Sequence, residues 1–413
     1  MVELQPLPAS RPFRYVRCGS GPLGRLRLSR QVFIEERDEL RAECLHLGIK
    51  GQLHVAPLRH VDERGSARVY QVLHTGLGAS LKWLTILRLT GDGTKTDPPQ
   101  EVDLLDGEKI LVTGVTGKIA FPIARTLAAG NEVWGAARLR GARDSDNLVA
   151  AGITPVPLDL STGDLSALPD DFTYVFHAAV DPGADDWQRC LKTNAHNSGE
   201  LLYQCRGAKG FVLCSTGSVY GYPGRRPLTE ADGPGVPLRA NYSFSKIAAE
   251  SVCSWISERF GIPLTIIRIC STYGPQGGAP ADRLDMMLAG KPIRLHPDAP
   301  NNYNPIYEDD YVALGIRAME VAASPPIIVN WAGSETVSVE DYCIYMGQLV
   351  GVEPTFEYTP RAHTPLWPDV TYMHQVLGRT KVSWREGFRR MVQARHPELE
   401  LAAMDSTTRE VQR

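Results

Sequence analysis

The sequence predicts an α/β protein in which a doubly wound parallel sheet follows a small α+β domain. Three observations predict this fold class. From about residue 108, short continuous apolar runs alternate with helical stretches, a pattern typical of strands that are buried on both faces. Gly, Asp, Thr and a proline pair cluster at 90–100, where neither a helical nor a strand period continues, which indicates a linker. The length of 413 residues allows about two to three domains.

Composition excludes several classes of protein. With 43% hydrophobic residues, 38 Gly and 30 Pro, the chain is neither disordered, collagen-like nor a coiled coil. A net charge of −3 provides no field for nucleic acid or anionic lipid, so we expect neither as a partner. The 8 cysteines include no CxxC pair, which favours a reducing cytoplasm over a disulfide framework. Signal-peptide and membrane-spanning patterns are missing, so we expect a protein that is neither secreted nor membrane-embedded.

The first predicted domain, residues 1–107, is a small α+β unit. Its Lys and Arg residues modestly outnumber its Asp and Glu residues, as on a solvated face. A helical pattern runs over 35–47 and ends before Gly48. Its scattered Cys and His residues match no zinc spacing, so we expect no metal. Its role stays open between a dimerisation element, a substrate lid and a docking module. The strand-like segments are 14–17, 25–34, 52–58, 67–74 and 83–90.

The α/β part divides into two lobes. We expect a dinucleotide-binding domain at 108–274, to which 305–333 returns, and a substrate-binding lobe made of 275–304 and 334–395. Residues 396–413 form a tail that we expect to be frayed. The predicted strands of the sheet are 110–115, 132–137, 154–160, 174–180, 210–216, 264–270 and 326–332.

A glycine-rich turn follows the first of these strands. Gly114 permits the tight turn, Gly117 lets backbone amides approach a pyrophosphate, and the small Ala120 allows close packing of helix on strand. A helix that begins at about residue 118 then offers unpaired N–H groups and the positive end of its dipole. Because strand, turn and helix follow one another directly, the pattern predicts a Rossmann-type domain for NAD(P).

The end of the second strand bears on the choice of cofactor. An acidic residue there typically binds the 2′-hydroxyl of NAD, whereas the 2′-phosphate of NADP requires a cation. Here the strand ends in Ala137 and Arg138, and Lys118 in the glycine turn adds a positive charge. We therefore favour NADP slightly over NAD. Asp159, after the third strand, is expected near the adenine, and a turn cap before Ser161 is its alternative role.

Two further segments carry catalytic residue types. Tyr242 and Lys246 lie one turn apart on a predicted helix, where the ammonium lowers the pKa of the phenol and fits it to exchange a proton with an alcohol. The strand 210–216 ends in Ser215 and Thr216, at the sheet edge where ligands bind. Either hydroxyl would suit the reacting oxygen, and capping of the following turn is the alternative.

Together these motifs resemble the extended short-chain dehydrogenase/reductase superfamily, in its NAD-dependent epimerase/dehydratase group. TGVTGKIA, LDL, VFHAAV, KTNAHNSGELL, STGSVYG, YSFSK, RICSTYGP and IYEDDYV occur in the family's order over about 108–395, whereas the N-terminal domain is not recognised. The resemblance implies Tyr242 as acid/base, Lys246 as ribose ligand, Thr216 as partner of the substrate oxygen, and Asn194 as the residue that steadies the active-site helix. It also implies His177 beside the cofactor, a small-molecule substrate and a homodimer. The implied cofactor contacts are Gly114, Thr116, Gly117, Lys118, Ile119, Arg138, Asp159, Leu160, Ala178, Ala179 and Lys246.

Departures from the family narrow the expected chemistry. Gly217-Ser218 stands where sugar-nucleotide dehydratases carry Asp-Glu, so the acid and base for eliminating water are missing. Ser271 replaces the usual Asn, and Asn304-Pro305 replaces a basic residue, which puts the usual diphosphate contacts in doubt. A compact substrate is expected from the short segment 274–307. Candidate substrate residues are Ser218, Ser271 and Arg283, with Lys291 and Arg294 as further cations or as solvated surface residues.

Three functions follow. The main hypothesis is an NAD(P)-dependent oxidoreductase that moves hydride at a secondary alcohol or ketone carbon. The first alternative is a nucleotide-sugar epimerase with tightly bound NAD. The second is a non-catalytic dinucleotide sensor, against which the intact Tyr242, Lys246 and Thr216 argue. The sequence leaves the substrate open.

Overall fold

A computed structural model describes residues 105–183, 186–235 and 240–402, together with the backbone of three strands nearer the N-terminus. These three strands lie in a unit formed by residues 1–100 and pair antiparallel in the order β1-β2-β3. They match three of the predicted strands, whereas the predicted helix 35–47 and strands 14–17 and 25–34 lie outside the described residues. The strands are β1 (Leu53–Arg59), β2 (Arg68–Thr75) and β3 (Leu81–Arg88).

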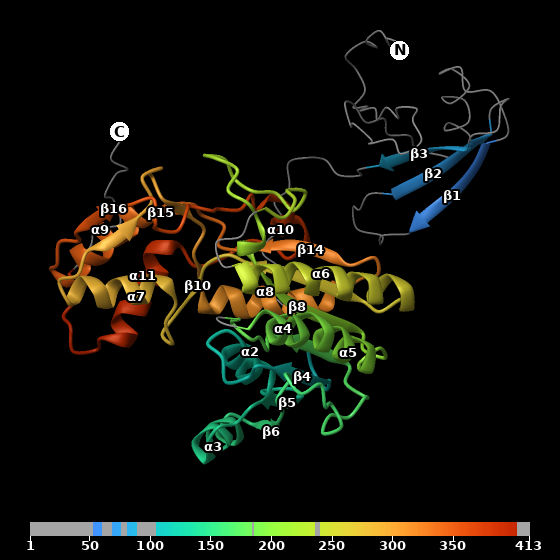
Figure 1. Cartoon of the computed structure of the whole chain (residues 1–413), viewed down its shortest axis with the longest axis horizontal. Coiled ribbons are helices and arrows are strands. Elements are labelled where there is room, and N and C mark those ends of the chain that lie inside the picture. The colour runs from blue at the N-terminus through green and yellow to red at the C-terminus, as the bar shows by residue number, and fades with distance from the viewer. Residues whose placement is uncertain are drawn as a thin grey trace, which may run out of the picture. The chain divides into compact units, whose positions relative to one another are not determined.

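The second unit, residues 101–413, contains a sheet of seven parallel strands in the order β14-β9-β8-β7-β4-β5-β6. This order and the flanking helices (Figure 1) confirm the predicted doubly wound, Rossmann-type fold. The strands are β4 (Lys109–Thr113), β5 (Glu132–Ala137), β6 (Ile153–Pro157), β7 (Tyr174–His177), β8 (Gly210–Thr216), β9 (Leu264–Ile269) and β14 (Ile327–Trp331).

Both faces of the sheet are buried because successive strand residues point in opposite directions. On β4, Ile110 and Val112 enter one apolar cluster, and Leu111 enters the other. Apolar residues at every strand position therefore find helices to pack on. The first cluster is covered by α2 (Ala120–Leu127), α3 (Ala142–Ala150), α8 (Glu308–Glu320) and α10 (Thr371–Val376). The second is covered by α4 (Trp187–Leu191), the π-helix η1 (Lys192–His196), α5 (Asn197–Gln204) and α6 (Ala240–Phe260).

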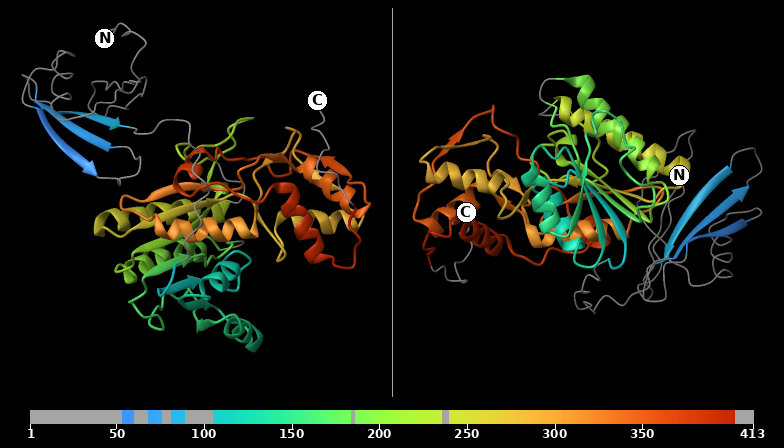
Figure 2. Two further views of the ribbon diagram at one scale, coloured as in Figure 1. Left: turned by 180° about the vertical axis from the view of Figure 1, so that it is seen from behind. Right: turned by 90° about the horizontal axis from the view of Figure 1, so that it is seen from below.

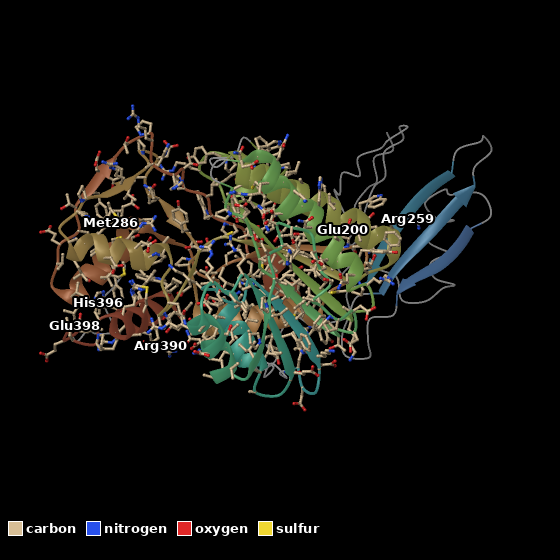
Figure 3. The ribbon with its side chains drawn as sticks, turned by 60° about the horizontal axis from the view of Figure 1, so that its bottom comes forward. Glu200, Arg259, Met286, Arg390, His396 and Glu398 are labelled. Atoms are coloured by element: carbon tan, nitrogen blue, oxygen red, sulfur yellow. The ribbon has the colours of Figure 1, made fainter. Side chains whose placement is uncertain are left out.

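A C-terminal lobe has its own core, in which Tyr273, Leu284, Met346 and Phe388 are buried together. Figure 3 labels Met286 on α7 and Arg390 on α11 in this lobe. Its helices are α7 (Ala279–Leu288), α9 (Val339–Val350) and α11 (Trp384–Arg395). Its short strands are β10 (Thr272–Tyr273), β11 (Ile293–Leu295), β12 (Asn302–Tyr303), β13 (Ile306–Tyr307), β15 (Val337–Ser338) and β16 (Phe356–Tyr358).

The chain beyond α11 is partly docked on this lobe. Leu401 packs against the lobe core, and the Ala402 N–H donates to the Leu349 carbonyl at 3.0 Å. The tail was expected to be frayed, and residues up to 402 are instead held by an apolar contact and a backbone hydrogen bond. Residues 403–413 lie outside the described part of the chain. Both the predicted domain boundaries and the role of residues 1–107 stay predictions.

Candidate active site

The glycine turn after β4 packs tightly against the loop that follows the neighbouring strand β7. Gly114 has φ +65°, and a Cβ there would lie 2.8 Å from the Ala179 backbone. The Gly117 N–H donates to the Gly114 carbonyl at 2.8 Å. No side chain caps the start of α2, where Ile119 is the N-cap residue. The first N–H groups of the helix therefore face the turn without a side-chain partner, as an anion site requires.

A cavity of about 270 Å³ opens at this edge of the sheet. Its wall contains six of the residues predicted to contact the cofactor: Gly114, Thr116, Arg138, Asp159, Leu160 and Ala179. Its wall also contains residues that were not among the predicted cofactor contacts: Ala136, Ala137, Leu139, Arg140, Asp144, Leu158, Ser161, Val180, Asp181 and Thr193. Predicted contacts that do not line it are Gly117, Lys118, Ile119, Ala178 and Lys246.

Lys118 lies toward the C-terminal lobe. A Cβ on Gly277, in the loop between β10 and α7, would be 2.7 Å from Lys118 Nζ. The ammonium therefore approaches the backbone of that loop, and a second positive charge on the cavity wall comes from Arg140 instead. Arg140 follows Arg138 by two residues, so the sequence already contained the signal that would have found it.

The turn after β5 carries cations. Arg138 and Arg140 are exposed on either side of Leu139, whose φ of +34° is unusual for a branched residue. The Arg140 N–H donates to Asp144 Oδ2 at 3.1 Å. Asp159 accepts from the Ser161 N–H at 2.9 Å, and hydrogen bonding from Ser161, with help from both arginines, lowers the pKa of the Asp159 carboxyl. Asp159 thus both caps the turn and lines the cavity.

Helix α6 carries the predicted acid/base pair. Tyr242 is half-buried, and Lys246, one turn later, is only 3% exposed. Burial lowers the pKa of the Lys246 ammonium below its ordinary value. Cys190, Cys214 and Cys253, together with Glu250, oppose that shift. Lys246 thus places a buried cation one helical turn after Tyr242 on α6, the spacing that the expected chemistry uses.

A chain of hydroxyls joins the end of β8 to the start of α6. Thr216 Oγ1 and Ser218 Oγ lie 3.1 Å apart, and Ser243 Oγ donates to Ser218 Oγ at 3.0 Å. Ser243 directly follows Tyr242, so Thr216, Ser218 and helix α6 are brought together. Ser215, the other candidate hydroxyl, donates to Glu250 Oε1. Thr216 Oγ1 accepts from the Ser218 N–H at 3.2 Å, so Thr216 makes the turn cap that was the alternative to a substrate contact.

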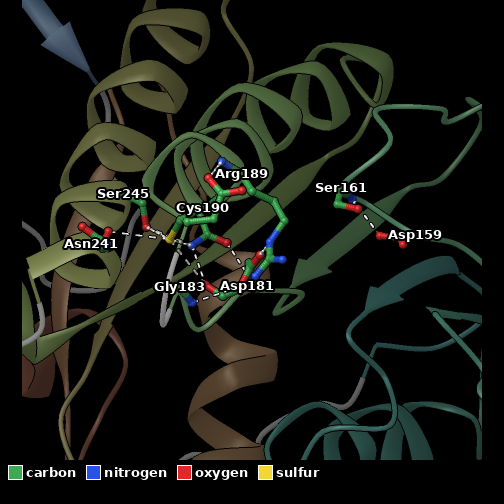
Figure 4. A network of polar contacts seen from close by, with 10 residues as sticks. Asp159, Ser161, Asp181, Gly183, Arg189, Cys190, Asn241 and Ser245 are labelled. Atoms are coloured by element: carbon green, nitrogen blue, oxygen red, sulfur yellow. Dashed lines mark hydrogen bonds and ion pairs between the residues drawn. The ribbon is translucent and has the colours of Figure 1, made fainter.

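Asn194 connects this helix to the loop after β7. Its side chain accepts from the Asp181 N–H at 2.8 Å and donates to Ser245 Oγ at 2.9 Å. Ser245 Oγ in turn donates to the Tyr242 carbonyl at 2.7 Å. Figure 4 shows Asp181, Cys190 and Ser245 converging in this network. Asn194 lies in the π-helix η1, a distortion common at functional sites.

His177 is enclosed behind the cavity. Its ring nitrogens contact Thr113 Oγ1 at 2.7 Å and Ser198 Oγ at 2.8 Å. Burial, together with the charge of Lys246, lowers the pKa of His177 to about 3. The ring is therefore neutral at ordinary pH. Because Thr113 also accepts from the Ala179 N–H at 3.1 Å, His177 supports the strand ends that carry the glycine turn.

A buried ion pair supports the other side of α6. Arg268 Nη2 donates to Glu250 Oε2 at 2.8 Å, and both side chains are at most 10% exposed. Arg268 also donates to the Tyr220 hydroxyl at 2.9 Å, and Tyr220 donates to Asn330 Oδ1 at 2.7 Å. The network joins α6 to β9 and β14, and the sequence offered no signal for it beyond the residue types themselves.

The residues present fit a dinucleotide. Thr193 Oγ1 is buried and has no hydrogen-bond partner among the described residues, and Thr193 lines the cavity. A buried hydroxyl without a partner costs stability unless a ligand satisfies it. The close contact of Gly114 with Ala179 shapes the same wall. The sequence did not single out Thr193, although it directly precedes Asn194.

The predicted substrate residues fall in different places. Ser218 belongs to the hydroxyl chain, whereas Ser271 lies in the loop between β9 and β10, where its carbonyl accepts from the Ile306 N–H. Arg283 is half-buried on α7. Lys291 is exposed, and Arg294 is exposed and paired with Glu357. Lys291 and Arg294 therefore agree with the second role considered for them, that of solvated surface residues.

Metal-ligand clusters and membrane spans are both absent from the described residues. No group of three or more His, Cys, Asp or Glu side chains is placed there to hold a metal ion. None of the helices found there is long and apolar enough to cross a membrane.

The chain matches the NAD dependent epimerase/dehydratase family over residues 110–332. It is 29% identical to an uncharacterized UDP-glucose epimerase, YtcB, of Bacillus subtilis, over 53% of this chain and 72% of that protein. It is 24% identical to a UDP-N-acetyl-alpha-D-glucosaminuronate decarboxylase of Bacillus cytotoxicus, over 69% of this chain and 97% of that protein. Among solved structures it is similar to UDP-glucuronic acid 4-epimerase of Bacillus cereus in complex with NAD, with a TM-score of 0.59 and 25% identity over 69% of this chain and 96% of the other.

Proposed function

The chain belongs to the NAD-dependent epimerase/dehydratase family, and from that premise we propose that it is an NAD-dependent epimerase acting on a secondary alcohol of a nucleotide-linked sugar. This was the first alternative drawn from the sequence, and the epimerases among its relatives support it over a simple oxidoreductase. The observation that carries the proposal is the meeting of Thr216, Ser218 and Ser243 beside Tyr242, at the edge of the sheet where the cavity opens.

Each residue has a physical role in this proposal. Tyr242 takes the proton of the substrate hydroxyl and later returns it, within the site. Lys246, whose ammonium is buried, favours the phenolate form of the tyrosine. Thr216 donates a hydrogen bond to the same substrate oxygen. Asn194 and Ser245 hold the first turn of α6, so that the phenol stays in place.

The cavity next to the glycine turn is the proposed dinucleotide site. The start of α2 would hold the pyrophosphate, and Asp159 and Leu160 would border the adenine. The Thr193 hydroxyl would form a hydrogen bond with the bound cofactor. When bound, NAD supplies the hydride acceptor that a secondary alcohol needs. Lys246 is proposed to contact the nicotinamide ribose.

Two related reactions fit less well. Elimination of water needs an acid and a base next to Thr216, where this chain has Gly217 and Ser218. A simple dehydrogenase would release its product after one hydride transfer, and none of the relatives described above is named as one. An epimerase would keep the cofactor and transfer the hydride back.

The test is a comparison of wild type with Tyr242→Phe on UDP-glucose and UDP-glucuronate. We expect wild-type protein to retain NAD on purification and to interconvert the epimers without added cofactor. Tyr242→Phe is expected to keep NAD and to lose about 10²- to 10⁴-fold in kcat, which is the usual contribution of a general acid/base. Equal activity in both proteins, or a wild type that converts neither sugar, would contradict the proposal.

A second candidate is an NADP-dependent oxidoreductase, favoured by Arg138 and Arg140 on the cavity wall. These cations suit a 2′-phosphate, whereas the preference drawn from the sequence rests on Arg138 and Lys118. The solved relative holds NAD, so the comparisons do not support the preference. Titrating both dinucleotides into wild type and Arg138→Ala separates the candidates. An NADP site predicts that Arg138→Ala weakens NADP alone, whereas equal effects on both dinucleotides favour NAD.

We also propose a homodimer in the cytoplasm. Helices α5 and α6 lie side by side on one face of the sheet (Figure 2), and this face exposes aromatic side chains. They are Trp187, Tyr203, Phe244, Trp255 and Phe260, at 41–63% exposure. Light scattering of Trp255→Glu against wild type tests the dimer, because a charge at the centre of such a face should favour the monomer. The cysteines of the described residues are free thiols, which supports a reducing compartment.

A further inference from the structure

Three hydroxyl groups form a chain that runs from the interior of the Rossmann domain to Thr216. Ser243, in the first turn of α6, is fully buried, whereas Thr216 and Ser218 are half-buried. Ser243 Oγ donates to Ser218 Oγ at 3.0 Å, and Ser218 Oγ lies 3.1 Å from Thr216 Oγ1. The chain therefore begins at an enclosed hydroxyl and ends at the C-terminal edge of β8.

Thr216 Oγ1 already acts as an acceptor at this end of the chain. It accepts from the Ser218 N–H at 3.2 Å, where it caps the short 3₁₀ helix η2 (Gly217–Val219). A hydroxyl has one proton and two acceptor lone pairs, so capping this turn leaves the Thr216 proton unused. Turn capping and a contact with the substrate oxygen are therefore compatible roles for Thr216, although the sequence presented them as alternatives.

The direction of the first hydrogen bond favours one arrangement of the protons. Because Ser218 Oγ accepts from Ser243, its own proton becomes a stronger donor, and Thr216 Oγ1 is the hydroxyl within reach. The N–H and the hydroxyl of Ser218 then occupy both lone pairs of Thr216 Oγ1. Among the described residues, Thr216 Oγ1 has no hydrogen-bond contact besides those with Ser218. Its proton is thus left for an oxygen bound at this edge of the sheet.

Neighbouring hydroxyls do not join this chain. Ser215 donates to Glu250 Oε1, and Ser245 donates to the Tyr242 carbonyl. Within the described part of the chain, Ser243 is therefore the hydroxyl that orients the other two.

We propose that Ser243 is a positioning residue, which acts through Ser218 to make the Thr216 hydroxyl a hydrogen-bond donor to the reacting oxygen of the substrate. This role rests on the proposed function and deepens it, because it states how the site recognises that oxygen. A donor held in this orientation stabilises the negative charge that develops on the oxygen as Tyr242 takes its proton. The three hydroxyls of the chain neither gain nor lose a proton in that step.

The test is a double-mutant cycle on the steady-state kinetics of the full chain with UDP-glucose and UDP-glucuronate. Ser243→Ala should lower kcat about tenfold and leave KM within about threefold, because the lost hydrogen bond acts on charge that develops during the reaction. Ser218→Ala should cost at least as much, and adding Ser243→Ala to it should have no further effect, since Ser243 acts only through Ser218. Additive losses, or a raised KM with an unchanged kcat, would overturn the proposal.

Further variants separate orientation from packing. Ser243→Thr keeps the hydroxyl and should recover most of the kcat that Ser243→Ala loses, whereas Ser243→Val, which has the shape of threonine without its hydroxyl, should not. Equal losses in these two variants would mean that Ser243 only fills space. Ser257→Ala is the matched control on the same helix, because Ser257 is fully buried and donates to the Ile262 carbonyl at 2.6 Å. It should keep the kcat of wild type.

A neutron crystal structure of the full chain locates the hydroxyl deuterons without any turnover. We expect the Ser243 deuteron to point to Ser218, the Ser218 deuteron to point to Thr216, and the Thr216 deuteron to have no acceptor in the hydroxyl chain. If Thr216 donates to Ser218 instead, the proposal is wrong even where the sugars are epimerised. If the deuterons lie as expected but no UDP-sugar is converted, the orientation of the chain stands and the proposed function fails.

Discussion

Arg268 in the Rossmann domain and Arg283 in the C-terminal lobe are both at least partly buried, but they differ in their hydrogen-bond partners. Around α6, Arg268 is paired with Glu250, and His177 is enclosed between Thr113 and Ser198. In the lobe, the Arg283 guanidinium lies over the Tyr342 ring, and no described residue accepts a hydrogen bond from it. Both regions have dense apolar cores, so loose packing is not the cause.

Polar groups that hydrogen-bond to other residues have a different role from polar groups without a partner. A polar group with partners in the chain holds two elements together and keeps few free donors or acceptors for a ligand. A buried polar group without a partner costs free energy and marks a place where a ligand completes the structure. Among the described residues of the Rossmann domain, Thr193 Oγ1 is the buried atom without a partner whose residue lines the cavity beside the glycine turn. In the lobe, the buried side-chain atoms without a hydrogen-bond partner among the described residues are Arg395 Nε and His396 Nε2.

The largest expected effect comes from breaking the buried pair. Glu250→Ala leaves Arg268 buried without its carboxylate and should lower the free energy of unfolding by about 3–5 kcal/mol. Urea denaturation of the two proteins measures the loss. The matched control is Glu386→Ala, which removes an exposed partner of Arg390 and should cost about 0–1 kcal/mol. Similar losses at both positions would remove the contrast between the regions.

A smaller effect is expected at Asn194. Asn194→Ala leaves the Asp181 N–H without its acceptor and should cost about 1–3 kcal/mol in unfolding free energy. Because Ser245 also loses one of its hydrogen-bond donors, Asn194 Nδ2, we expect a lower kcat with little change in cofactor affinity. Thermal denaturation and steady-state kinetics check both effects. Asn147→Ala, an exposed change on α3, should stay within about 0.5 kcal/mol of wild type. If Asn194→Ala behaves like this control, the network does not hold α6.

His177 should make stability depend on pH. Its pKa is lowered to about 3 in the folded state, whereas an unfolded histidine titrates near 6.5. Below pH 6.5 the unfolded state therefore binds a proton that the folded state refuses, and stability falls as pH falls toward 3. Between pH 6.5 and 5.5 wild type should lose about 1 kcal/mol more than His177→Gln. The free energy of unfolding is measured by urea denaturation at each pH. If it changes equally with pH in both proteins, His177 takes up a proton in the folded state as readily as in the unfolded state.

The smallest effect on stability is expected at Arg283. Because this arginine has no acceptor among the described residues, Arg283→Met should change the free energy of unfolding by less than about 0.5 kcal/mol or raise it slightly. The same urea melts used for Glu250→Ala provide the comparison. A loss comparable to that of Glu250→Ala would mean that Arg283 supports the lobe as Arg268 supports the Rossmann domain.

Local sequence signals predicted the parts of the site that lie close together along the chain. The strand, glycine turn and helix around Gly114 follow from residue types at adjacent positions, and one turn of helix places Tyr242 and Lys246 together. These signals did not indicate that the long side chain of Lys118 approaches the Gly277 loop. They also left Ser215 and Thr216 equivalent, because only Glu250, from another element, distinguishes them.

By itself, then, the sequence determined the parallel sheet, the glycine turn after β4 and the placing of Tyr242 and Lys246 one helical turn apart, because each depends on spacing along one strand or helix. Only the tertiary structure decided which polar groups are satisfied. Glu250 and Arg268, Asn194 and Asp181, and Arg283 and Tyr303 come from separate elements. Whether a buried group is paired depends on packing between those elements, and residue order along the chain does not encode that directly.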